Sequence, residues 1–202
     1  ASTQTIPHGL SQKPDFMIVK QLTDSSTAWT VYHSSLGAKK YLEFDDGAVG
    51  DATGPWNDTE PTASVFHVGA SYNNVNRVSR NFISYLWHNV PGLQKFGSYG
   101  GADAFVELGF RPAVLIIKSL SANRNWIIID SARDTFNPSD RALLPNDTSA
   151  EDDNSVYAID FLSNGFKVRG SNGQIDGDTT YVYAAWAEAP TVNLYGASAN
   201  AR

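Results

Sequence analysis

The chain has 202 residues, of which 42% are hydrophobic and 18% are charged, and its formal net charge is −6. A net negative charge opposes binding to a phosphate backbone, and the lack of cysteine excludes disulfides and thiolate metal sites. Its apolar runs are far shorter than the roughly 20 residues that span a bilayer. We therefore expect no nucleic-acid partner and no membrane insertion.

The N-terminal stretch ASTQTIPHGL has neither the basic region nor the apolar region of a signal peptide. We expect the chain to be the C-terminal part of a longer protein. Aromatic residues make up 12% of the chain, and sixteen glycines add to a composition that favours strands and turns.

The first predicted strand in chain order is FMIVK at residues 16–20, which follows Pro14. Its continuous apolar run, rich in β-branched residues, is typical of a strand buried on both faces. Next, WTVYH at residues 29–33 alternates between two faces. VFHVG and NFISYLWHNVP are the later segments of this half of the chain, and polar turns such as DDG and GPWND separate the strands.

Each of these segments recurs in the second half of the chain in the same order. KPDFMIVKQL returns as RPAVLIIKSL, so that Pro14 and Pro112 lie about 98 residues apart. Trp29 matches Trp126, VFHVG matches GFKVRG, and NFISYLWHNVP matches TYVYAAWAEAP. The period is too long for a solenoid. The sequence therefore predicts an all-β fold of two tandem homologous β-sandwich modules of jelly-roll type, at residues 1–91 and 92–202.

The segments HGLSQKPDFMIVK, SYLWHNVPGLQKFGSYGG, GFRPAVLIIK, DFLSNGFKVRGSNG and YVYAAWAEAP also carry a family resemblance. They resemble the tandem modules of phage tail-fibre and other virion-appendage proteins, particularly those of marine and freshwater phages. The resemblance covers nearly the whole chain. It implies the receptor-binding C-terminal region of a tail fibre, extracellular on the virion, which binds a host-surface receptor and is non-catalytic.

The same resemblance implies three kinds of partner: a host-surface glycan, further copies of this chain in a homotrimer, and other virion proteins. Two alternatives keep the fold and change the role: a structural decoration protein of the virion, or the tip domain of a bacterial adhesive fibre. A surface depolymerase is a further hypothesis, because acidic loops supply paired carboxylates for glycoside hydrolysis. The resemblance implies no cofactor.

The carboxylates of the acidic loops are also the candidate ligands for a calcium ion. Their carboxylates follow none of the spacings of a defined calcium loop, and carboxylates in turns are usually solvated. The residues concerned are Asp45, Asp46, Asp51, Asp58, Glu60, Asp147, Glu151, Asp152 and Asp153. The histidines His8, His33, His67 and His88 lie far apart without metal-ligand spacing. We therefore predict no metal site, and the chain has no nucleophile elbow or phosphate loop either.

Residues that recur in both halves are predicted to be scaffold. Lys20 and Lys118 each end an apolar strand, and we expect each to lay its stem on the nearby tryptophan with its ammonium in water. By the same reasoning, a ligand site falls in loops that differ between the halves. Trp56 in GPWNDTEP can stack on a sugar while polar neighbours bind its hydroxyls. The predicted ligand-binding residues are Trp56, Asn57, Asp58, Phe136 and Asn137.

Overall fold

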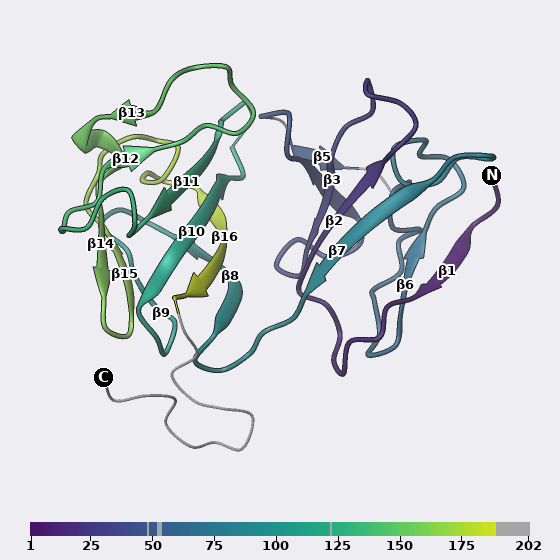
Figure 1. Cartoon of the computed structure of the whole chain (residues 1–202), viewed down its shortest axis with the longest axis horizontal. Coiled ribbons are helices and arrows are strands. Elements are labelled where there is room, and N and C mark those ends of the chain that lie inside the picture. Colours follow the sequence, from purple (N-terminus) through teal and green to yellow (C-terminus); the bar gives the residue numbers. More distant parts are fainter. Residues whose placement is uncertain (48, 52–53, 122, 189–202) are drawn as a thin grey trace. The chain divides into compact units, whose positions relative to one another are not determined.

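The computed structural model describes the chain except residues 48, 52–53, 122 and 189–202 (Figure 1). The chain divides into two compact units, Ala1–His88 and Asn89–Arg202. This division falls slightly before the predicted boundary at residues 91 and 92. No helix among the described residues is long and apolar enough to cross a membrane.

The first unit contains a five-stranded sheet in the order β5-β4-β3-β2-β7 and a two-stranded sheet of β1 and β6. All of its pairs are antiparallel. The strands are β1 (Gln4–Pro7), β2 (Phe16–Gln21), β3 (Thr30–His33), β4 (Lys40–Glu43), β5 (Val49–Asp51), β6 (Val65–Val68) and β7 (Phe82–Trp87).

The second unit contains a four-stranded sheet in the order β11-β10-β16-β8, a three-stranded sheet in the order β14-β15-β9, and the short pair β12-β13. These pairs are antiparallel as well. The elements are β8 (Gln94–Gly100), β9 (Phe105–Glu107), β10 (Pro112–Ser119), β11 (Trp126–Asp130), β12 (Arg141–Ala142), β13 (Asp152–Asp153), the 3₁₀ helix η1 (Ser155–Tyr157), β14 (Ile159–Leu162), β15 (Gly165–Val168) and β16 (Thr180–Ala187).

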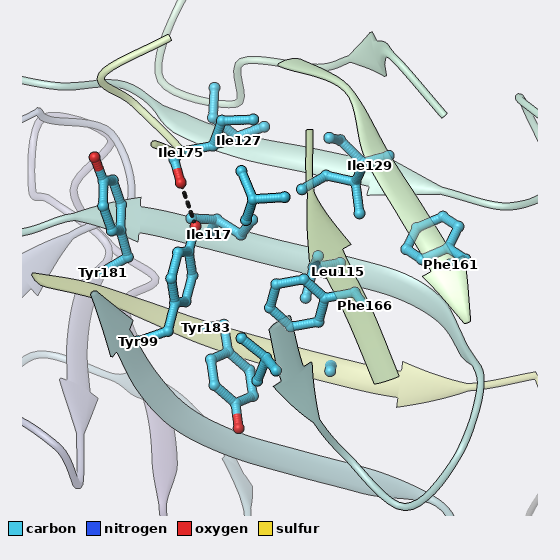
Figure 2. Packing of buried hydrophobic residues seen from close by; sticks show 14 of the residues in the cluster. Tyr99, Leu115, Ile117, Ile127, Ile129, Phe161, Phe166, Ile175, Tyr181 and Tyr183 are labelled. Carbon is cyan, nitrogen blue, oxygen red and sulfur yellow. Dashed lines mark hydrogen bonds between the residues drawn. The ribbon is translucent and has the colours of Figure 1, made fainter. Parts of the chain in front are cut away.

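In each unit the hydrophobic core contains residues of two sheets. Met17 and Val19 of the five-stranded sheet share a buried cluster with Phe66 of β6. In the second unit, Leu115 of β10 and Phe166 of β15 belong to one cluster, which Figure 2 shows from close by. This is the arrangement of a β-sandwich. The prediction of an all-β, sandwich-like fold is confirmed.

The apolar runs predicted as core strands are the central strands of both large sheets. β2 lies between β3 and β7, and β10 lies between β11 and β16. A central strand that is covered on both faces needs apolar residues on both faces, and both of these strands have them. The pairing around the central strand is therefore alike in the two units, while homology of the units stays a prediction.

The two repeated lysines, Lys20 and Lys118, have different surroundings. Lys20 lies with its Nζ 6.0 Å from the ring centroid of Trp29 and donates to Thr27 Oγ1 at 3.0 Å. Lys118 is fully buried, and its Nζ donates to the carbonyl of Ser119 at 2.7 Å. The expectation of an ammonium in water is wrong for Lys118. A buried ammonium is tolerated where an oxygen acceptor such as the Ser119 carbonyl takes the place of water.

Candidate functional site

The loop that contains Trp56 does not present its ring to solvent. Trp56 is 1% exposed, and its ring meets that of Tyr32 edge to face at a centroid distance of 5.8 Å. The loop folds inward because Gly69 N donates to the Pro55 carbonyl at 3.0 Å. A Cβ at Gly69 would lie 1.8 Å from the Gly54 carbonyl oxygen, so this close approach requires glycine.

Asn57 and Asp58 follow Trp56 but remain at the surface, both in the left-handed region with φ of 54° and 50°. Asp58 Oδ2 lies 3.7 Å from Lys39 Nζ. The structure thus separates the two polar residues from the ring they were expected to assist. In this structure the Trp56 ring belongs to the core and presents no face to solvent, and its ligand role stays a prediction.

Glu60 accepts hydrogen bonds through both of its carboxylate oxygens. Its Oε2 accepts hydrogen bonds from Lys13 Nζ and Tyr32 Oη, each at 2.7 Å, and its Oε1 accepts one from Ala38 N at 2.7 Å. Burial acts to raise the pKa of Glu60, but these three donors outweigh it and hold the pKa below its usual value of 4.5.

This geometry predicts a pH dependence for the first unit. Because the folded-state pKa of Glu60 is lowered, its contribution to stability is present above about pH 4.5 and is lost as the pH falls through the folded pKa. We expect the Glu60→Gln variant to show a smaller fall in melting temperature between pH 6 and pH 3 than the wild type. Thermal unfolding followed by circular dichroism measures this. Parallel curves for the two proteins would contradict it.

Two of the other loop carboxylates also have structural contacts. Asp45 Oδ1 accepts a hydrogen bond from Trp29 N at 3.0 Å, and Glu151 Oε2 accepts one from Arg133 Nη1 at 2.6 Å. The described residues contain no group of three or more His, Cys, Asp or Glu side chains that could hold a metal ion.

The second predicted loop, at residues 134–140, does present an aromatic ring. Phe136 is 81% exposed, the largest value among the large hydrophobic residues that the structure describes as exposed. Exposing a large aromatic ring to water is unfavourable. An exposed ring on a loop that is held in place therefore indicates a binding surface. Phe136 is therefore the surviving aromatic candidate for ligand binding.

Asn137 anchors this loop through its amide. Its Nδ2 donates to the Phe161 carbonyl at 3.0 Å, and its Oδ1 accepts from Phe161 N at 2.9 Å. The amide thus pairs with β14 as a neighbouring strand would. The Asn137–Pro138 peptide is cis, and the Ser139 backbone also pairs with Ile159. Asn137 thus helps to position the Phe136 loop in this structure, and its role as a ligand contact stays a prediction.

Two carboxylates flank the Phe136 loop. Asp140 N donates to Asp134 Oδ2 at 3.0 Å, which closes the loop on itself. Burial raises the pKa of Asp140, and the charges of Asp134 and Asp153 raise it further. An exposed ring in a loop with carboxylates can bind a sugar. The ring stacks on the apolar face of the sugar, and the carboxylate oxygens accept hydrogen bonds from its hydroxyls.

The first unit also contains a groove with a volume of about 220 Å³, which was not predicted from the sequence. Its lining combines apolar and polar residues and includes two arginines: Gln4, Ile6, Val19, Phe66, Val68, Val75, Asn76, Arg77, Arg80, Phe82, Ile83 and Ser84. The arginines are exposed. One sequence feature could have pointed to this groove: NNVNRVSR, at residues 73–80, differs from its counterpart in the second half. The segment contains no aromatic residue, so it was not selected as a candidate ligand site.

A family model described as Domain of unknown function (DUF7483) matches residues 1–190. The chain belongs to this family. The match to DUF7483 spans the whole first unit and the described part of the second, so the Phe136 loop and the groove both fall inside it. No curated protein and no solved structure matches the chain.

Proposed function

We propose that this DUF7483 chain is a non-catalytic attachment module of a phage tail fibre, which binds host-surface glycan through the loop at residues 134–140. The observation that carries the proposal is the 81% exposed ring of Phe136 on a loop that is anchored at both sides of the ring. An aromatic side chain on a rigid loop binds at a low entropy cost, because the loop loses little conformational freedom when the ligand binds.

The polar surroundings support a glycan rather than an apolar ligand. Asp134 and Asp140 lie in the same loop, and sugars need both a stacking surface and hydrogen-bond acceptors. The carboxylates disfavour an acidic glycan at this loop, so we propose a neutral or basic one.

We further propose that the chain lies outside the host cell, on the tail fibre of the virion. Its partners there are the host glycan, two further copies of itself in a homotrimer, and other virion proteins. Small β-sandwiches have edge strands, and neighbouring chains in a fibre can cover them, which supports a trimer. Sedimentation equilibrium at micromolar concentration tests the trimer, and a monomer mass would contradict it for this chain.

The Phe136→Ala variant tests the site. We expect its binding to an array of bacterial surface polysaccharides to weaken by about tenfold or more, because truncating an aromatic anchor at an interface costs this much. Its melting temperature should not change, since the ring contacts mainly solvent.

Phe105→Ala is the matched control, because Phe105 is another exposed phenylalanine of the same unit, 49% exposed on β9. We expect this variant to bind the array like the wild type. Equal loss in both variants, or no loss in Phe136→Ala, would contradict the proposed site.

A further inference from the structure

In the second unit, strand β8 completes the core by inserting one aromatic ring. Tyr99 of β8 pairs opposite Tyr181 of β16, and the two rings stack at a centroid distance of 4.9 Å. The Tyr99 hydroxyl donates to the Ile175 carbonyl at 2.7 Å, which Figure 2 shows as a dashed line. Tyr99 is 9% exposed. One strand thus supplies main-chain pairing and a buried ring together.

In the first unit, β7 holds the place that β16 holds in the second. Ser84 of β7 pairs opposite Val19 of the central strand β2, and Tyr183 of β16 pairs opposite Ile117 of the central strand β10. On its other side, β16 pairs with β8. Over the residues that the structure describes, β7 is the last strand of its sheet.

The groove of the first unit corresponds to the space that Tyr99 fills in the second. Phe66 and Phe82 line the groove. Phe66 pairs opposite β1 as Phe166 pairs opposite β9, and Phe82 begins β7 where Tyr181 lies in β16. Phe166 and Tyr181 are the two rings that contact Tyr99. The walls that hold an aromatic ring are therefore present in the first unit.

The hydrogen-bond acceptor for a ring hydroxyl has a counterpart as well. Val75 lines the groove, and its N donates to the Tyr72 carbonyl in a tight turn. Ile175 N donates to the Asn172 carbonyl in the same kind of turn. The Val75 carbonyl thus matches the carbonyl that accepts the hydroxyl of Tyr99.

The size and rim of the groove indicate what kind of group enters it. Sites that bury a drug-sized ligand have roughly 300–1,000 Å³, whereas this groove has about 220 Å³, which suits a single side chain. Arg77 Nη1 already lies 3.7 Å from Asp24 Oδ2, so Arg80 is the lining cation that favours an acidic neighbour to that side chain. Tyr85 of β7 is 43% exposed and Val78, in the segment before β7, is 69% exposed, so apolar surface is also available on and next to this strand.

We propose that the groove beside β7 binds an extended strand of another polypeptide, antiparallel to β7, with a tyrosine side chain inserted opposite Phe82. Strand addition gives affinity through main-chain hydrogen bonds and specificity through the pocket for the inserted side chain. An acidic residue near that tyrosine would meet Arg80. This site joins one protein chain to another and is separate from the proposed glycan site.

The test uses the full chain and a fluorescein-labelled peptide with the sequence of residues 94–100, QKFGSYG. We expect saturable binding by fluorescence anisotropy, and at least about tenfold weaker binding of the peptide QKFGSAG, which lacks the ring and its hydroxyl. Equal binding of the two peptides, or no saturable binding, would overturn the proposal.

A variant of the groove checks the register of the added strand. In the second unit a Cβ at Gly97 would lie 2.7 Å from Tyr183 Oη, so Gly97 is required opposite that tyrosine. Ser84 is small, so the wild type should bind QKFASYG as well as QKFGSYG. The Ser84→Tyr variant should bind the glycine peptide at least about tenfold more tightly than the alanine peptide. No difference between the peptides with this variant would contradict the register.

Hydrogen exchange then locates the bound strand. We expect the QKFGSYG peptide to slow exchange of amides in β7 and to leave β5, at the opposite end of the sheet, unchanged. Slower exchange confined to β5 would overturn the proposal even if the peptide binds.

Discussion

The Trp56→Ala variant is expected to lower the stability of the first unit by about 3–5 kcal/mol, the usual cost of removing a buried large aromatic side chain. Trp56 is 1% exposed and belongs to the cluster that contains Tyr32, Phe66 and Val68. Its loss would leave a cavity against these three side chains. The second unit has a core cluster of its own and should not be affected.

Because two units unfold in one chain, a single melting temperature does not isolate this effect. Native-state hydrogen exchange reports each unit separately. We expect faster exchange in β2 and β3 and unchanged exchange in β10 and β16. Trp56→Phe, which keeps a ring in the core, should show a smaller loss. Unchanged exchange together with lost glycan binding would instead support the ligand role that the sequence suggested for Trp56.

The Tyr99→Ala variant should have an effect of similar size in the second unit, about 3–5 kcal/mol. It removes the ring that stacks on Tyr181 and meets Phe166 edge to face, and it removes the donor to the Ile175 carbonyl. Tyr99→Phe separates the two contributions. It keeps the ring and should lose only about 1–3 kcal/mol, the cost of a buried acceptor left without its donor.

Hydrogen exchange in β8 and β16 measures the effect of both Tyr99 variants. If Tyr99→Ala exchanged like the wild type, the inserted ring would not stabilise the second unit. The analogy on which the strand-docking groove depends would then fail.

The sequence predicted the parts of the fold that depend on local patterns. The runs FMIVK and VLIIK are continuous apolar segments, and both became central strands. Strand β8 was not predicted because GSYGG has the composition of a turn. Its glycine has a packing reason instead: the ring of Tyr183 occupies the space above Gly97. That reason depends on a neighbouring strand and is invisible in the local sequence.

The candidate site was harder to predict, since it depends on which loop side chains turn inward. Trp56 and Phe136 both stand among turn residues, yet one is buried and the other is 81% exposed. The difference comes from tertiary contacts: Gly69 allows the Trp56 loop to approach the core, whereas Asn137 holds the Phe136 loop on β14. The groove is set by strand order, which no segment specifies alone.

The most direct test of a non-catalytic glycan-binding role is to incubate the wild-type chain with an array of bacterial surface polysaccharides and measure two quantities. These are the amount of chain retained and the reducing ends released into solution. The proposed function predicts saturable retention on at least one polysaccharide, with no increase in reducing ends over a protein-free control. Retention on none of them, or reducing ends that rise with time, would contradict it.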